Sequence, residues 1–160
     1  MALCYRITKI LVTKMCGFNI RLATEDDLAQ IIGLDEEITG LPKPEYWQDM
    51  FYRYGGERHN RFFLVACDTE RVIGFTIGEV RAWEFGSPPC GWIFAINVSP
   101  SARLKSIGSE LFDAIRKKLK EAGVDKVRTM LSKGDNLVMS FFRSQGMMAG
   151  PFIQLEMDIG

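Results

Sequence analysis

The residues best suited to chemistry lie in one short loop in the middle of the chain, between an apolar run and an amphipathic segment. Arg103, Lys105, Ser106, Gly108 and Ser109 supply two cations, two hydroxyls and one position without a side chain. A loop that opens a helix turns several unpaired backbone N–H groups toward one point, where the helix dipole adds positive potential. The composition therefore predicts an anion site, of which a diphosphate is the usual occupant.

Two elements must position this loop. The run Ile93–Val98 is almost continuously apolar, which is typical of a strand covered on both faces, and Pro100 ends it. After the loop, apolar residues return at helical spacing, with charged residues on the other side. These apolar residues are Ile107, Leu111, Ala114, Ile115 and Leu119. The stretch is predicted to form a strand, a turn and a long helix.

The segment NVSPSARLKSIGSELF, which spans these elements, resembles the acyl-CoA loop of the Gcn5-related N-acetyltransferases, the GNAT superfamily. In that family a strand ends in V-x-P, and (Q/R)-x-x-G-x-(G/A) opens the next helix. Arg103 matches the first position and Gly108 the last, whereas Ser106 stands where the family has its middle glycine.

A second segment, NLVMSFFRSQGM, resembles the family block N-x-x-A-x-x-F-Y-x-x-x-G-F, with Asn136, Phe141, Gly146 and Met147 in register. The resemblance extends from Asn19 to the C-terminus. It implies an α/β fold of the α+β type, with a mixed, mainly antiparallel sheet of six to seven strands flanked by about four helices.

The resemblance implies acetyl-CoA as co-substrate, no metal, and an amine as acceptor. The implied cofactor-binding positions are Ile96, Asn97, Val98, Arg103, Leu104, Lys105, Ser106, Ile107, Gly108, Ser109, Asn136, Phe141, Phe142 and Arg143. The backbone amide of Val98 would hold the thioester oxygen as negative charge develops. Asn136 either binds the pantetheine arm or is simply the N-cap of a helix.

Two glutamates are candidates for the base that deprotonates the amine. Glu79 shares strand parity with Ile73, Phe75 and Ile77, so alternation places a carboxylate on an apolar face, where burial would raise its pKa. A bulge near Gly78 or the end of the strand would instead turn it to solvent. Glu84, on the following loop, is the second choice.

The general acid of the family is missing. The family tyrosine that protonates the departing thiolate falls at Phe142, which has no hydroxyl. Tyr46, Tyr52 and Tyr54, on the second predicted helix, are either substitutes or packing residues. The sequence thus favours an N-acetyltransferase acting on a primary amine of a small molecule or protein. The alternative is a catalytically weak or inactive acyl-CoA-binding sensor or interaction module.

The composition excludes several classes of function. The 160 residues carry twenty basic and twenty acidic side chains, so no global field attracts nucleic acid or a membrane surface. The four cysteines lie far apart without a C-x-x-C pair, and His59 is the single histidine, so no metal site is expected. No stretch is long and apolar enough for a membrane span or a convincing signal peptide, which predicts a cytoplasmic location.

The remaining elements follow from turn residues and periodicity. Residues 1–18 are predicted to be an N-terminal extension, an extra strand or a tail, and residues 19–160 a single domain. The expected strands are Asn19–Leu22, Phe62–Cys67, Val72–Val80, Val127–Leu131 and Phe152–Met157; the expected helices follow Thr24, Pro44, Ser106 and Asn136. A homodimer is common among members of the resembled family.

Overall fold

The computed structural model describes residues 17–160, apart from the side chains of Phe85 and residues 103–105. Residues 1–16, most of the predicted N-terminal extension, lie outside the described residues. The chain falls into two units, one ending at Arg128 and the other formed by Thr129–Gly160, and each is described by itself.

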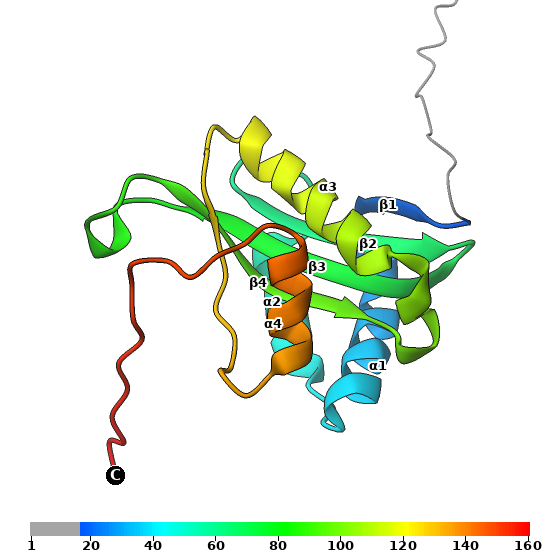
Figure 1. Cartoon of the computed structure of the whole chain (residues 1–160). Helices are drawn as coiled ribbons and strands as arrows, with labels where there is room; N and C mark the ends of the chain where they lie inside the picture. The colour runs from blue at the N-terminus through cyan, green and yellow to red at the C-terminus, as the bar shows by residue number, and fades with distance from the viewer. Residues whose placement is uncertain (1–16) are drawn as a thin grey trace, which may run out of the picture. The chain divides into compact units, whose positions relative to one another are not determined.

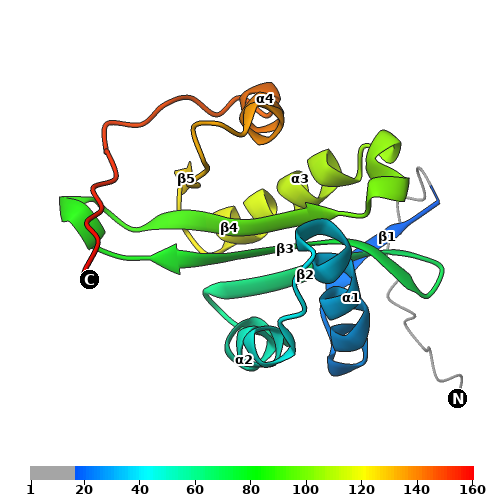
Figure 2. The same cartoon turned by 90° about the horizontal axis from the view of Figure 1, so that it is seen from below.

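The first unit is a five-stranded sheet covered by helices on both faces. Its strands lie in chain order: β1 (Asn19–Leu22), β2 (Arg61–Asp68), β3 (Arg71–Arg81), β4 (Cys90–Val98) and β5 (Val127–Arg128). All neighbours are antiparallel except β4 and β5, which are parallel. Helices α1 (Leu28–Thr39) and α2 (Pro44–Tyr54) cover one face, and α3 (Ile107–Glu121) covers the other (Figures 1 and 2).

Three short 3-10 helices, η1 (Glu25–Asp27), η2 (Glu84–Gly86) and η3 (Pro100–Lys105), join these elements. The second unit contains one helix, α4 (Asn136–Ser144).

The fold class is confirmed, with differences in the strands. The sheet of the described residues has five strands instead of six to seven. β5 stops at Arg128 rather than Leu131, and the predicted strand Phe152–Met157 is wrong for this chain, because the segment pairs with no strand. Its alternating pattern is present, but a strand needs a neighbouring strand to satisfy its backbone groups.

The α1–α2 face of the sheet carries one apolar core. Helix α2 begins at Pro44, whose missing N–H costs nothing at the first helical position. Trp47 packs edge-on against Phe75, with ring centroids 5.0 Å apart, and close to Phe63 at 6.3 Å. Ile31 and Leu34 of α1 join the same buried cluster. The two helices are thereby fixed to the middle of β2 and β3.

The α3 face depends on three glycines. A Cβ atom at Gly74 would lie 3.1 Å from Leu111, one at Gly78 would lie 2.9 Å from Ile115, and one at Gly91 would lie 2.7 Å from Leu119. The three helix residues are spaced by four, so they form one row on α3. Because the three glycines have no side chains, this row of α3 residues lies directly on the backbone of β3 and β4.

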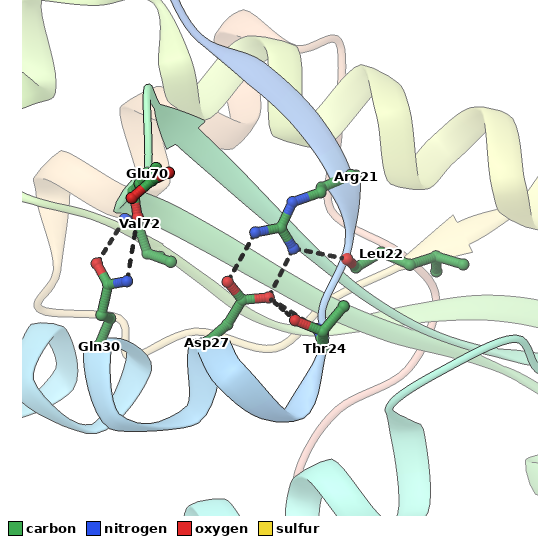
Figure 3. Close-up of polar contacts among 7 residues, drawn as sticks. All are labelled: Arg21, Leu22, Thr24, Asp27, Gln30, Glu70 and Val72. Atoms are coloured by element: carbon green, nitrogen blue, oxygen red, sulfur yellow. Dashed lines mark hydrogen bonds and ion pairs between the residues drawn. The ribbon is translucent and has the colours of Figure 1, made fainter.

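A polar network fixes the start of α1 to the sheet (Figure 3). The Asp27 carboxylate accepts hydrogen bonds from both terminal nitrogens of Arg21, at 2.6 and 2.8 Å, and from the backbone N–H of Thr24 at 2.8 Å. One turn further, the Gln30 amide donates to the Glu70 carbonyl and accepts from the Val72 N–H, so it spans the turn between β2 and β3. Both contacts set the angle at which α1 leaves the sheet.

We expect Gly78→Ala to lower the free energy of unfolding by about 1–3 kcal/mol, because the new methyl group overfills the α3 face. Its Cβ would lie 2.7 Å from the Trp92 backbone oxygen, which cannot move aside as a side chain can. Urea denaturation measures the effect. The control is Gly33→Ala in α1, where nothing lies within 4 Å. That change should be neutral or stabilise by up to about 1 kcal/mol, and equal effects at the two positions would contradict the argument.

Asp27 should contribute stability that depends on pH. Burial alone would raise the pKa of Asp27, but the hydrogen bonds from Arg21 and Thr24 outweigh it, so the pKa is lowered. A carboxyl with a lowered folded pKa stabilises the protein above its unfolded pKa of about 4, and this stability is lost as the pH falls through the folded value.

Asp27→Asn should therefore cost about 1–3 kcal/mol at pH 7 and make the loss of stability below pH ~4 less steep. Unfolding by urea at several pH values measures both. Asp26→Asn, an exposed neighbour, should change stability by less than about 0.5 kcal/mol. If Asp27→Asn lost stability below pH ~4 as steeply as wild type, Asp27 would not be the source of this pH dependence.

Candidate functional site

One edge of β4 has no neighbouring strand in the described first unit. β5 pairs only with Gly91 and Trp92, so the stretch from Ile93 to Val98 is paired with β3 on one side alone. Beyond the end of β4, the Ser99 N–H bonds the Ile73 carbonyl of β3. Because backbone groups alternate along an extended chain, the N–H groups of Val98 and Ile96 point to the open side. This edge can bind an extended, amide-containing ligand.

The open edge leads directly into the predicted anion loop. η3 follows β4, and α3 then begins at Ile107. The first i to i−4 hydrogen bond of α3 runs from the Glu110 N–H to the Ser106 carbonyl, at 3.1 Å. The N–H groups of Ile107 and Gly108 precede this bond and are thus available to an anion. The backbone of the predicted residues Arg103, Leu104 and Lys105 lies in η3, and Ser109 lies in the first turn of α3.

Ser106 is the turning point between η3 and α3. It adopts the left-handed conformation, with φ +57° and ψ +15°. This conformation is strained for a residue with a Cβ atom, whereas glycine adopts it freely. Its exposed side chain makes no capping hydrogen bond to α3. The backbone thus keeps a geometry suited to glycine, although the sequence has serine.

Glu79 is the centre of a polar cluster, here called the Glu79 cluster, formed with Tyr54, Arg61 and Arg81. The Tyr54 hydroxyl donates to Glu79 Oε2 at 3.0 Å, and Arg81 Nε donates to Oε1 at 2.8 Å. Arg61 Nε lies 3.6 Å from Oε2. The Glu79 side chain is 12% exposed and lies on the α1–α2 face, as parity predicts. It is, however, paired with arginines instead of standing alone among apolar side chains.

Tyr54 links the Glu79 cluster to β4. Burial and the hydrogen bond to Glu79 raise the pKa of Tyr54, so the hydroxyl keeps its proton and acts as a donor. Its ring packs edge-on against Phe94, with centroids 5.2 Å apart. Phe94 is the extra residue at a β-bulge, where the register between β3 and β4 shifts. The cluster therefore adjoins the point where the open edge of β4 begins.

The second candidate base lies at the margin of this cluster. Glu84, in η2, is 44% exposed and 3.8 Å from Arg81. The sequence analysis did not predict the partners of Glu79. Strand alternation could have indicated Arg81, because residues two apart lie on the same side of a strand. The sequence analysis also missed Trp92, whose ring lies under Arg81 and whose Nε1 is buried without a hydrogen-bond partner in the described structure.

The second unit holds the other predicted cofactor residues, on α4. Asp135 caps this helix by accepting from the Val138 N–H at 3.0 Å, so the interpretation of Asn136 as the cap is wrong. The exposed Asn136 side chain is the first of the helix. Phe141 and Phe142 pack edge to face, with centroids 5.1 Å apart, and Arg143 is exposed. Phe142 supplies no proton donor.

The sequence model of the acetyltransferase (GNAT) family matches residues 28–147, three quarters of the chain. The protein belongs to this family. The match includes β4, η3, α3 and α4, the elements that carry the predicted cofactor residues. A search of curated proteins finds no match.

Solved structures share the GNAT fold at low sequence identity. A transcriptional regulator from Bacillus halodurans C-125 is 22% identical, with a TM-score of 0.75, over 89% of this chain and 99% of its own. The aminoglycoside 6'-N-acetyltransferase AAC(6')-Ih from Acinetobacter baumannii is 19% identical, with a TM-score of 0.74, over 90% and 100%. Aminoglycoside N-acetyltransferase AAC(6')-Iy, solved with CoA, is 16% identical, with a TM-score of 0.79, over 94% and 100%.

The described residues contain no group of three or more potential metal-ligating side chains. Nor does any helix among residues 17–160 have the length and apolar character to cross a membrane.

We expect Ser106→Gly to stabilise this GNAT protein by about 0.5–1 kcal/mol, because glycine relieves the left-handed strain and no side-chain cap is lost. Thermal or urea unfolding measures it. Ser140→Gly, the same replacement at an exposed position inside α4, is the control and should lower stability by up to about 0.5 kcal/mol. A loss of stability in Ser106→Gly would show that the hydroxyl makes a contact that outweighs the strain.

Proposed function

We propose that this protein is an acetyl-CoA-dependent N-acetyltransferase that acts on a primary amine of a small molecule or protein. The observation that carries the proposal is the open edge of β4 leading into the start of α3. An acyl-CoA has the matching chemistry, because its amide-rich arm suits a strand edge and its diphosphate suits a helix N-terminus. The structure of AAC(6')-Iy in complex with CoA supports this choice of donor.

In the proposed reaction the amine nitrogen attacks the carbonyl carbon of the thioester. The new C–N bond forms as the C–S bond breaks, and CoA leaves as a thiolate. The N–H of Val98, on the open side of β4, is our candidate for stabilising the oxyanion. Holding the two reactants together provides much of the acceleration, so the reaction does not depend on one acid.

Glu79 is our candidate for the base that removes the ammonium proton. Its carboxylate lies on the face of the sheet opposite α3, beside the bulge where the open edge begins. Arg81 and Tyr54 orient it, so an acceptor would replace a hydrogen-bond partner to reach it. The nitrogen loses its second proton to water as the amide forms. Water would also protonate the thiolate, because the family tyrosine is replaced by Phe142.

A second candidate function is a CoA-binding sensor with little or no catalysis. Phe142 favours it, because the position that supplies the acid in the family carries no hydroxyl. The ion pairs of Glu79 also favour it, since they occupy the carboxylate that would act as base. The two functions share the same cofactor site and differ in whether the acetyl group is transferred from CoA to an amine.

We expect thiol release from acetyl-CoA with at least one amine of a panel containing polyamines, amino acids, short peptides and aminoglycosides. The aminoglycosides are included because structural relatives act on them. Glu79→Gln should lower kcat/KM by roughly 100-fold or more and flatten the pH–rate profile, while calorimetry shows unchanged affinity for CoA.

Glu84→Gln is the matched control, and its kcat/KM should stay within about two-fold of wild type, as for a surface change. Heat of CoA binding without thiol release across the panel would favour the sensor. Absence of any binding heat would overturn both functions. Normal kinetics in Glu79→Gln would remove Glu79 as the base.

A further inference from the structure

Arg61 is the cation of the Glu79 cluster that has no close carboxylate. It begins β2 and lies directly opposite Glu79 in the register of β2 and β3, so both side chains lie on the same face. Its Nε is 3.6 Å from Glu79 Oε2, which is beyond hydrogen-bond distance. Within the described part of the chain the Arg61 guanidinium donates no hydrogen bond, and it lies over the Tyr54 ring at 5.4 Å. Its contact with Glu79 is therefore the loosest in the cluster.

The two neighbouring arginines differ from Arg61 because each has a carboxylate partner. Arg81 Nε donates to Glu79 at 2.8 Å. Arg53 forms an ion pair with Asp49, four residues earlier on α2. Of these three guanidinium groups, that of Arg61 has the least compensated charge.

This difference decides what an amine displaces when it reaches Glu79. The bonds from Tyr54 and Arg81 to the carboxylate are 3.0 and 2.8 Å long, so Arg61 is the partner that leaves most readily. A plain amine then replaces one ion pair by another. An amine that also carries a carboxylate replaces one ion pair by two, because its carboxylate binds the released guanidinium. A carboxylate matches the planar fork of arginine with two parallel hydrogen bonds.

The short distance between the two protein groups limits the acceptor further. Because Glu79 Oε2 and Arg61 Nε are 3.6 Å apart, the amine and the carboxylate that bind them must also be close together. In an α-amino acid one carbon separates the two groups. A polyamine would instead bring a second cation toward Arg61, and like charges in contact are unfavourable.

We propose that the acceptor is a free amino acid, selected by Arg61 through its carboxylate while Glu79 binds its amine. This inference rests on the proposed acetyl transfer and names the substrate class. The chemical step is unchanged: the C–N bond forms as the C–S bond breaks, and the two protons of the nitrogen pass to Glu79 and to water. The carboxylate of the acceptor keeps its charge throughout.

The test compares each amino acid with its own amide, which has an amine but no carboxylate. Thiol release from acetyl-CoA is measured with a set of L-amino acids and their amides. Wild type should acetylate at least one amino acid. Arg61→Gln should lower the ratio of kcat/KM for the acid to kcat/KM for the amide by roughly 10- to 100-fold, the size of a charge-assisted hydrogen bond. The change in this ratio is independent of amine basicity and of any effect on Glu79 as base, because both apply equally before and after or to both acceptors.

Arg53→Gln is the matched control. The Arg53 and Arg61 side chains are 43% and 44% exposed, and both lie over the Tyr54 ring. The control should leave the ratio within about two-fold of wild type. Arg61→Lys keeps the charge without the fork and should recover part of the preference. Calorimetry with CoA verifies that each variant is folded.

Three outcomes would overturn the inference while acetyl transfer stands. They are a ratio unchanged in Arg61→Gln, an equal loss in Arg53→Gln, and thiol release with amides or polyamines but with no amino acid. CoA binding without thiol release from any amine would instead overturn the proposed function, and this inference with it.

Discussion

The close approach of α3 to three glycines is the constraint on which the site depends. Gly74, Gly78 and Gly91 let one row of α3 side chains rest on the backbone of β3 and β4. A helix held this closely has little freedom to slide or rotate, because packed interiors do not deform continuously. Its first turn therefore stays next to the end of β4. The packing of this row thus sets the separation between the backbone donors of the loop and those of the open strand edge.

The opposite face of the sheet is organised by charge as well as by packing. Glu79 is surrounded by Tyr54, Arg61 and Arg81, and Asp27 by Arg21 and Thr24. Each carboxylate is largely buried, and each obtains hydrogen bonds that offset the loss of water. The hydrogen bond to Glu79 raises the pKa of Arg81 above its ordinary value, because it favours the charged form of the guanidinium.

Local patterns predicted most of this fold. The strand, loop and helix from Ile93 to Leu119, and the face of Glu79, follow from periodicity, which reports which side of an element is buried. Periodicity does not show which residues far apart in the sequence contact one another. The arginines around Glu79 and the bulge at Phe94 depend on the register between strands, and the two-residue length of β5 depends on its neighbour. Nor does periodicity reveal the left-handed conformation of Ser106, which glycine adopts more readily than serine.

The strand order has a consequence for how the chain assembles. β1 to β4 are antiparallel neighbours, and β2–β3 and β3–β4 are joined by short connections, whereas β5 enters in parallel only after α3 has crossed the sheet. Contacts between distant segments form late, because closing a long loop costs entropy before any contact is gained. We therefore expect the β2–β3–β4 meander to be the nucleus, and the two edge strands β1 and β5, each reached through a long connection that contains helices, to join it later.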